Sequence, residues 1–200
     1  MQPVCFISVG HAGRTPPDFG SSYEGFRELD GIRIYVDAMA KRLREMGWRA
    51  EIREGKYAVA KTEANAAGAI VYVNAHINAG MGGRTEPSAQ RGEIFYDYQT
   101  RPQNGMALAA SIAESLHTGV GHPVYPKPCR PDTNGVPRDG DYAEAYGCIR
   151  GVAAPAVCTE PFFLDGAGRA SLRSPDGLAR IGVLIADGIH AWAFTTGRIS

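Results

Sequence analysis

The chain has 200 residues, of which 44% are hydrophobic and 21% are charged, so it is long and apolar enough to bury one core. Its 21 basic and 21 acidic residues cancel to a net charge of zero, which leaves no positive field to hold nucleic acid or anionic lipid. Its 25 glycines and 13 prolines predict many turns or long loops around a compact centre.

The N-terminal segment is apolar but has no basic leader and no hydrophobic region long enough for a signal peptide. No window reaches the roughly 18 uncharged apolar residues of a membrane span. We therefore expect a protein that is made in the cytoplasm and does not bind a membrane. The cysteines form no CxxC pair, so we expect buried thiols rather than disulfides or a cysteine-rich zinc site. They are Cys5, Cys129, Cys148 and Cys158.

The first half of the chain alternates strand and helix patterns. A nearly continuous apolar run over 3–9 predicts a strand that is covered on both faces. Apolar residues at helical spacing over 32–43 predict a helix that packs on the sheet. A weak strand over 48–53 and an alanine-rich helix over 57–67 follow. The run 69–75 is the strongest strand signal in the chain.

The second half continues the alternation, with a strand over 92–98 and a helix over 105–117. Five prolines and four glycines in the segment 118–145 predict a long irregular loop. The last predicted elements are two short strands and an amphipathic helix, over 146–150, 156–160 and 178–192. This order predicts a single α/β domain with a mixed, mostly parallel central sheet and helices on both faces.

Three polar residues stand at the carboxyl ends of predicted strands, namely His11, His76 and Glu160. Such strand ends meet at one edge of a parallel sheet, so we expect these side chains to lie close together. Two histidines and a carboxylate are a common ligand set for a catalytic zinc ion, which keeps a fourth position for water. The pattern predicts a metal site with one carboxylate ligand still to be found.

The candidates for that carboxylate are Glu24 and Glu28, where the glycine-rich segment enters the first helix. We prefer Glu28, because it falls on the apolar stripe that faces the sheet, where an unsatisfied carboxylate is costly. The alternative is that Glu28 only stabilises the start of the helix through the helix dipole.

Four segments resemble, in order, the motifs of one known family. They are Val9-Gly10-His11-Ala12-Gly13, Gly25-Phe26-Arg27-Glu28, Val73-Asn74-Ala75-His76-Ile77-Asn78-Ala79 and Ala154-Pro155-Ala156-Val157-Cys158-Thr159-Glu160-Pro161-Phe162-Phe163. The family is the zinc-dependent N-acetylmuramoyl-L-alanine amidases of the amidase-3 type, found in bacterial autolysins and phage endolysins. The chain departs from it at Ala12, where glycine is usual, at Asn74, where serine or threonine is common, and in lacking the Asp-Pro-Gly that commonly follows the first motif.

The resemblance implies that His11, Glu28 and His76 bind zinc and that Glu160 is the catalytic acid–base. Zinc would polarise the amide carbonyl and activate a water, whose proton Glu160 would pass to the departing amine. The bond cut would be the amide between N-acetylmuramic acid and L-alanine in peptidoglycan. Asn78 is a candidate for substrate binding, as is Arg150, which would orient Glu160 or bind a substrate carbonyl unless it is a surface residue.

Two other functions fit parts of the pattern. A zinc peptidase acting on peptide stems commonly has His and Glu three residues apart, whereas Arg14 stands in that place here. A catalytically silent peptidoglycan-binding module would not need Glu160. His122 and Cys129 lack the spacing of a second metal site. We expect one catalytic domain over 1–200, a monomer, and a phage or prophage lysin that waits in the cytoplasm and acts on the cell wall after release.

Overall fold

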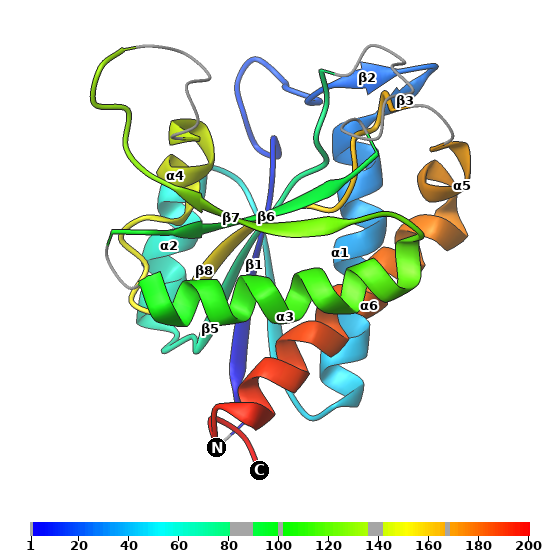
Figure 1. Ribbon diagram of the computed structural model, residues 1–200. Helices are drawn as coiled ribbons and strands as arrows, with labels where there is room; N and C mark the ends of the chain where they lie inside the picture. Colours follow the sequence, from blue (N-terminus) through cyan, green and yellow to red (C-terminus); the bar gives the residue numbers. More distant parts are fainter. Residues whose placement is uncertain (1, 81–89, 100–101, 136–141, 167–168) are drawn as a thin grey trace.

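A six-stranded sheet runs through the centre of the protein in a computed structural model that describes residues 2–80, 90–99, 102–135, 142–166 and 169–200 (Figure 1). Its strand order is β4-β1-β5-β8-β6-β7. The strands are β1 (Val4–Val9), β4 (Arg49–Glu54), β5 (Val71–Ala75), β6 (Gly92–Asp97), β7 (Val124–Cys129) and β8 (Ala156–Glu160). All of these except β7 are predicted from the sequence to within a few residues.

Four neighbouring strands, β4, β1, β5 and β8, are parallel, whereas β6 runs antiparallel to β8 and β7 runs parallel to β6. The sheet is therefore mixed and mostly parallel, and the chain folds as the single α/β domain that the sequence predicts. The carboxyl ends of β1, β5 and β8 lie at one edge of the sheet. A short hairpin of β2 (Ser22–Tyr23) and β3 (Phe26–Arg27) stands above that edge (Figure 1).

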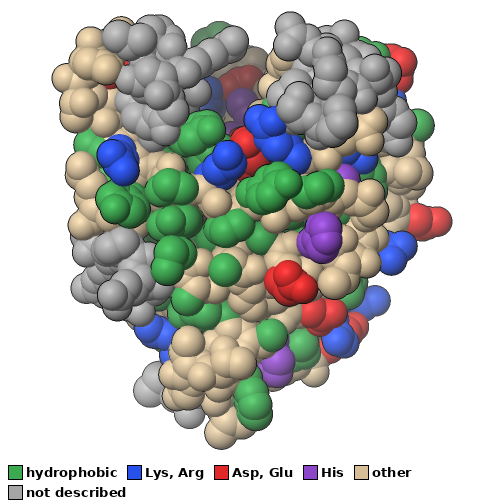
Figure 2. Space-filling model, in the orientation of Figure 1, with side chains coloured by type: hydrophobic (Ala, Val, Ile, Leu, Met, Phe, Trp, Pro, Cys, Tyr) green, Lys and Arg blue, Asp and Glu red, His purple; other side chains and the backbone are tan. Residues whose placement is uncertain are grey.

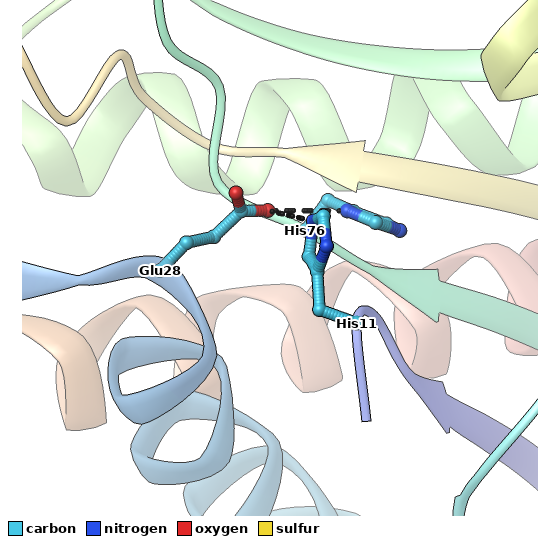
Figure 3. A group of neighbouring side chains, drawn as sticks. All are labelled: His11, Glu28 and His76. Carbon is cyan, nitrogen blue, oxygen red and sulfur yellow. Dashed lines mark hydrogen bonds and ion pairs between the residues drawn. The ribbon is translucent and has the colours of Figure 1, made fainter. Parts of the chain in front are cut away.

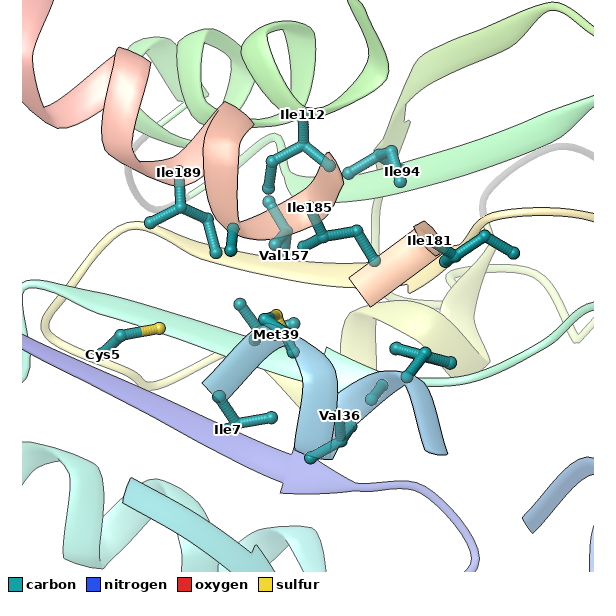
Figure 4. Packing of buried hydrophobic residues seen from close by; sticks show 14 of the residues in the cluster. Cys5, Ile7, Val36, Met39, Ile94, Ile112, Val157, Ile181, Ile185 and Ile189 are labelled. Atoms are coloured by element: carbon teal, nitrogen blue, oxygen red, sulfur yellow. The ribbon is translucent and has the colours of Figure 1, made fainter. Parts of the chain in front are cut away.

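Helices cover both faces of the sheet, as predicted. One face packs against α1 (Glu28–Glu45), α3 (Pro102–Val120) and α6 (Pro175–Thr195), and their aliphatic side chains interdigitate with those of the strands (Figure 4). The other face packs against α2 (Tyr57–Ala66) and α4 (Ala143–Ile149). The short α5 (Ala170–Arg173) precedes α6. All four cysteines are buried and free, as expected.

Within the described ranges, α6 alone is long and apolar enough to cross a membrane. Half of its most apolar window is buried, and it packs closely against α1 and α3. Its start has a regular cap, because the Ser174 hydroxyl accepts a hydrogen bond from the Gly177 N–H at 3.1 Å. These contacts are those of a core helix.

The prediction of an irregular segment over 118–145 is wrong in part, because β7 lies within it. The carbonyls of Pro123 and Cys129 point toward β6 and accept hydrogen bonds from that side at 2.8 and 3.3 Å. Alternate residues face away from β6, so Pro126 and Pro128 lie on the open side of this edge strand. There their missing N–H groups break no ladder hydrogen bond, so the prolines are compatible with the strand.

The predicted strand over 146–150 is also wrong, since these residues form most of α4 and its end. Tyr146, Cys148 and Ile149 are buried against the second face of the sheet. A short apolar run fits a buried helix as well as a buried strand, so periodicity alone could not separate the two.

Candidate active site

Three side chains from separate elements meet at the carboxyl edge of the sheet (Figure 3). His11 follows β1, His76 follows β5, and Glu28 is the first residue of α1. The imidazole rings meet edge to face, with centroids 4.8 Å apart. One possible ligand atom from each residue lies within 4.8 Å of the others, so among the described residues this is the group that could hold a metal ion.

Glu28 is the centre of the group and is almost fully buried. Its Oε1 lies 3.1 Å from His11 Nε2 and 3.1 Å from His76 Nδ1, and accepts a hydrogen bond from the Ile77 N–H at 3.1 Å. Its Oε2 accepts one from the Ser21 N–H at 2.9 Å. Burial raises the pKa of Glu28, but the hydrogen bonds from the two histidines outweigh it and lower the pKa to about 2.

His11 is held in an unusual backbone conformation, with φ at 62°, in the left-handed region that side chains other than glycine rarely adopt. Its Nδ1 lies 2.9 Å from Asp18 Oδ2, which Arg14 also contacts at 2.6 Å. Burial lowers the pKa of His11, but the partners Glu28 and Asp18 raise it above its ordinary value. A carboxylate on the second ring nitrogen orients a metal-binding histidine.

Asp18 is a site residue that the sequence analysis missed. The sequence signal that could have indicated it is the presence of an acidic residue in the same glycine-rich segment as the candidate ligand His11. Its Oδ1 accepts a hydrogen bond from the Gly20 N–H at 2.8 Å, which shapes the loop around the carboxylate. The 2.9 Å contact with Nδ1 makes Asp18 the partner of His11, although its side chain is partly exposed.

Two glycines allow the backbone to pack against the group. A Cβ on Gly10 would lie 2.6 Å from two atoms of the His76 ring, and one on Gly20 would lie 2.5 Å from Glu28 Oε2. Gly20 also has a φ of 70°. Any larger residue at either position would displace a candidate ligand.

The donor set fits a zinc ion. Two imidazole nitrogens and one carboxylate oxygen are typical zinc ligands, and tetrahedral bonds of about 2.0–2.1 Å would place neighbouring ligand atoms about 3.3 Å apart. The two contacts of Glu28 Oε1 with the histidines, at 3.1 Å each, are close to that spacing. The carboxylate is ionised, and three neutral or anionic donors converge on one point, so the group could bind a metal ion.

Glu160 ends β8 next to the group. The His76 N–H donates to the Thr159 carbonyl at 3.0 Å, and Ala75 pairs with Thr159, so His76 and Glu160 emerge from neighbouring strands. Glu160 Oε2 is buried and has no hydrogen-bond partner among the described residues. Burial, followed by the nearby charge of Glu28, raises the pKa of Glu160 well above its ordinary value.

Asn78 lies in the wall of the site. Its side-chain amide donates to Glu93 Oε2 at 3.2 Å, and its backbone N–H donates to the Phe162 carbonyl at 3.1 Å. The first bond joins the segment after β5 to β6, and the second joins it to the segment after β8. The Asn78 side chain is therefore held in place beside the site by its hydrogen bond to Glu93.

Two other candidate residues lie apart from the group. Arg150 is exposed at the end of α4, with its guanidinium 5.8 Å from the centre of the Tyr146 ring, and it precedes β8, whereas Glu160 ends that strand. Glu24 is exposed and forms an ion pair with Arg173 at 2.6 Å. The structure thus brings Glu28, rather than Glu24, to the histidines.

His122 and Cys129 form no second metal group with other described residues. His122 is buried, and its Nε2 lies 3.0 Å from the Pro161 carbonyl oxygen. The Cys129 thiol donates to the Tyr96 carbonyl at 3.2 Å. Both side chains have structural partners.

The site opens to the surface. Figure 2 shows the molecule hollowed at its upper edge, where acidic, histidine and basic side chains are visible. This edge carries the carboxyl ends of β1, β5 and β8 in the same orientation in Figure 1. A large substrate could therefore approach the group from this side.

Solved structures share this fold. N-acetylmuramoyl-L-alanine amidase AmiC2 of Nostoc punctiforme is 18% identical, with a TM-score of 0.75 over 96% of this chain and 97% of that chain. The catalytic domain of CwlV, an N-acetylmuramoyl-L-alanine amidase from Bacillus (Paenibacillus) polymyxa var. colistinus, is 19% identical, with a TM-score of 0.73 over 97% of this chain and 99% of that chain. An N-acetylmuramoyl-L-alanine amidase from Clostridium difficile 630 is 18% identical, with a TM-score of 0.73 over 98% and 99%.

The sequence itself matches a family model. No curated protein matches the chain. The family model described as N-acetylmuramoyl-L-alanine amidase matches residues 5–191, which include His11, Glu28, His76 and Glu160. Because this match spans nearly the whole chain, the protein belongs to the N-acetylmuramoyl-L-alanine amidase family.

Proposed function

We propose that His11, Glu28 and His76 hold a zinc ion, and that Glu160 moves the proton, in the peptidoglycan amide hydrolysis that family membership assigns to this enzyme. The bond is the amide between N-acetylmuramic acid and L-alanine. The observation that carries the proposal is a contrast between two glutamates. Glu28 has partners on both oxygens, with the two histidines at Oε1, whereas Glu160 Oε2 is buried and has no hydrogen-bond partner among the described residues.

Zinc bound at this group would supply Lewis-acid polarisation of the scissile carbonyl and a water with a pKa near 7. Glu28 stays ionised, and Asp18 orients His11, so the ligand set is ready before substrate arrives. Glu160 takes one proton from the water that attacks the carbonyl carbon. It then gives that proton to the amine nitrogen of L-alanine as the carbon–nitrogen bond breaks.

The environment of Glu160 supports this role. A raised pKa brings a carboxyl group closer to the working pH, where it can both accept and return a proton. Among the residues that the structure describes, none forms a hydrogen bond with its Oε2 that would have to break before this oxygen meets the water. A carboxylate bound as firmly as Glu28 could not perform this transfer.

Digestion of purified peptidoglycan by the zinc-loaded protein tests the proposal, with the new ends identified by mass spectrometry. We expect free L-alanine amino groups on intact peptide stems. New carboxyl ends within the stems would instead indicate the zinc peptidase, and no cleavage by the wild type would indicate the silent binding module. Glu160→Gln should hydrolyse peptidoglycan far more slowly than the wild type yet bind zinc as the wild type does. Loss of its zinc would contradict the separate role of Glu160.

The proposal extends to where and how the protein acts. Peptidoglycan as substrate places its action at the cell wall, and we propose a monomer released from the cytoplasm as a phage or prophage lysin. Expression inside a sensitive host should leave the culture intact until the membrane is permeabilised, and sedimentation should give one species near 21.4 kDa. Lysis before permeabilisation, or a stable dimer, would contradict these two parts.

A further inference from the structure

A buried phenol contacts the backbone that carries His76. Tyr35 lies seven residues after Glu28 on α1, which is two helical turns, so both side chains face the sheet. Tyr35 is fully buried, and its hydroxyl donates to the His76 carbonyl at 2.9 Å. The same oxygen lies 3.2 Å from Thr159 Oγ1. Because the phenol proton is used at His76, the Thr159 hydroxyl is the donor in this second bond.

The peptide unit between His76 and Ile77 is thereby held at both of its polar atoms by one helix. Tyr35 binds its carbonyl oxygen, and Glu28 Oε1 accepts its N–H at 3.1 Å. Glu28 also contacts the His76 ring, at 3.1 Å from Nδ1. A rotation of this peptide unit would therefore break a bond to Tyr35 and move His76 relative to Glu28.

The same phenol links the strand of His76 to the strand of Glu160. Thr159 receives the His76 N–H on its carbonyl at 3.0 Å and contacts Tyr35 through its hydroxyl. Together with the hydrogen bond from Tyr35 to the His76 carbonyl, these two bonds form a closed ring that joins α1, the end of β5 and the end of β8. Thr159 is fully buried, so water cannot replace a lost bond without opening the core.

We propose that Tyr35 is a positioning residue, which fixes the distance between the His76–Glu28 ligand pair and Glu160 by clamping the 76–77 peptide and Thr159. The proposal rests on the zinc site of the proposed function. It predicts that removing one buried oxygen atom, which contacts only the backbone carbonyl of the candidate ligand His76 and the Thr159 hydroxyl, weakens metal binding. Outer-shell partners of metal ligands have such effects.

The test measures zinc affinity by chelator competition and the visible absorption spectrum of the cobalt-substituted protein. Tyr35→Phe should weaken zinc binding by about tenfold or more and change the cobalt spectrum. Tyr72→Phe is the matched control, because Tyr72 is also fully buried and lies on β5, but packs with Phe6 on the opposite face of the sheet. It should leave both readouts unchanged.

Thr159 supplies a second pair of variants in case Tyr35→Phe folds poorly. Thr159→Val removes the hydroxyl at nearly constant volume and should weaken zinc binding, as Tyr35→Phe does. Thr159→Ser keeps the hydroxyl and should bind zinc as the wild type does. Thermal unfolding of the zinc-free proteins separates a general loss of stability from a loss at the site.

Three results would overturn the role of Tyr35. These are a wild-type zinc affinity and cobalt spectrum in Tyr35→Phe, an equal loss of affinity in Tyr72→Phe, and a loss in Thr159→Ser as large as that in Thr159→Val. Failure of the wild type to bind zinc would instead refute the proposed function itself. The two failures are therefore distinguishable.

Discussion

The start of α1 and the end of β8 each bring one buried glutamate to the same edge of the sheet, and their surroundings differ. Glu28 receives contacts on both oxygens from two histidines and two backbone N–H groups, and its pKa falls to about 2. Glu160 has a buried oxygen that no described residue hydrogen-bonds, and burial raises its pKa well above the ordinary value. Environment, rather than residue type, thus suits one carboxylate to hold a cation and the other to move a proton.

The largest expected effect comes from replacing the Glu28 carboxylate with an uncharged amide. Glu28→Gln removes the charge shared by the two histidines, so we expect no stoichiometric zinc and no detectable hydrolysis. Zinc content after dialysis, measured by atomic emission, checks this. Glu24→Gln is the matched control, because Glu24 is exposed and paired with Arg173, and it should keep wild-type zinc. If Glu24→Gln loses zinc and Glu28→Gln keeps it, the ligand assignment is reversed.

The next largest effect distinguishes the role of Glu160 from that of Glu28. Glu160→Gln should lower kcat by about 10²–10⁴-fold, the contribution of a positioned acid–base group, while zinc content stays that of the wild type. Release of L-alanine amino ends from peptidoglycan gives the rate. Glu51→Gln, on the far edge strand β4, serves as the control. A Glu160→Gln enzyme with wild-type kcat would show that the proton travels by another group.

A smaller effect is expected at Asp18, which contacts the proposed ligand His11. Asp18→Asn removes the charge that orients His11 and should weaken zinc binding by about 10–100-fold, with a smaller loss of activity at saturating zinc. Competition with a zinc chelator measures it. Asp30→Asn changes an exposed aspartate paired with Arg27 and should leave zinc affinity as it is. Equal affinities in Asp18→Asn and the wild type would assign Asp18 to loop structure alone.

The smallest effect is expected at Arg150. The residue lies at the opposite end of β8 from Glu160 and is exposed, so Arg150→Ala should leave both kcat and KM for peptidoglycan nearly unchanged. Rates over a range of substrate concentrations check this. A raised KM would restore Arg150 as a substrate-binding residue and would require the substrate to reach far beyond the carboxyl edge of the sheet.

Much of this account could be predicted from the sequence, because strand ends in a mostly parallel sheet share an edge. That rule, with the motif order, selects His11, His76 and Glu160 before any coordinates. Prediction of secondary structure from the sequence fails at two places. The prolines of β7 are typical of a loop rather than of an edge strand, and the apolar run of α4 is too short to show a helical period.

The supporting residues of the site could not be predicted in the same way. Asp18 reaches His11 only because the loop between them folds back, with φ of 62° at His11. Tyr35 and Thr159 lie in elements that look like ordinary core helix and strand, and they meet across 124 positions of sequence. Contacts of this kind depend on tertiary packing, which a single sequence does not display.

The central claim is tested most directly by a crystal structure of the zinc-loaded protein with data collected at the zinc absorption edge. The account predicts one anomalous peak, bonded at about 2.0–2.1 Å to His11, Glu28 and His76. It also predicts the Glu160 carboxyl within reach of a single bridging water. A peak elsewhere, no peak, or a Glu160 carboxyl too distant for one water to bridge would contradict it.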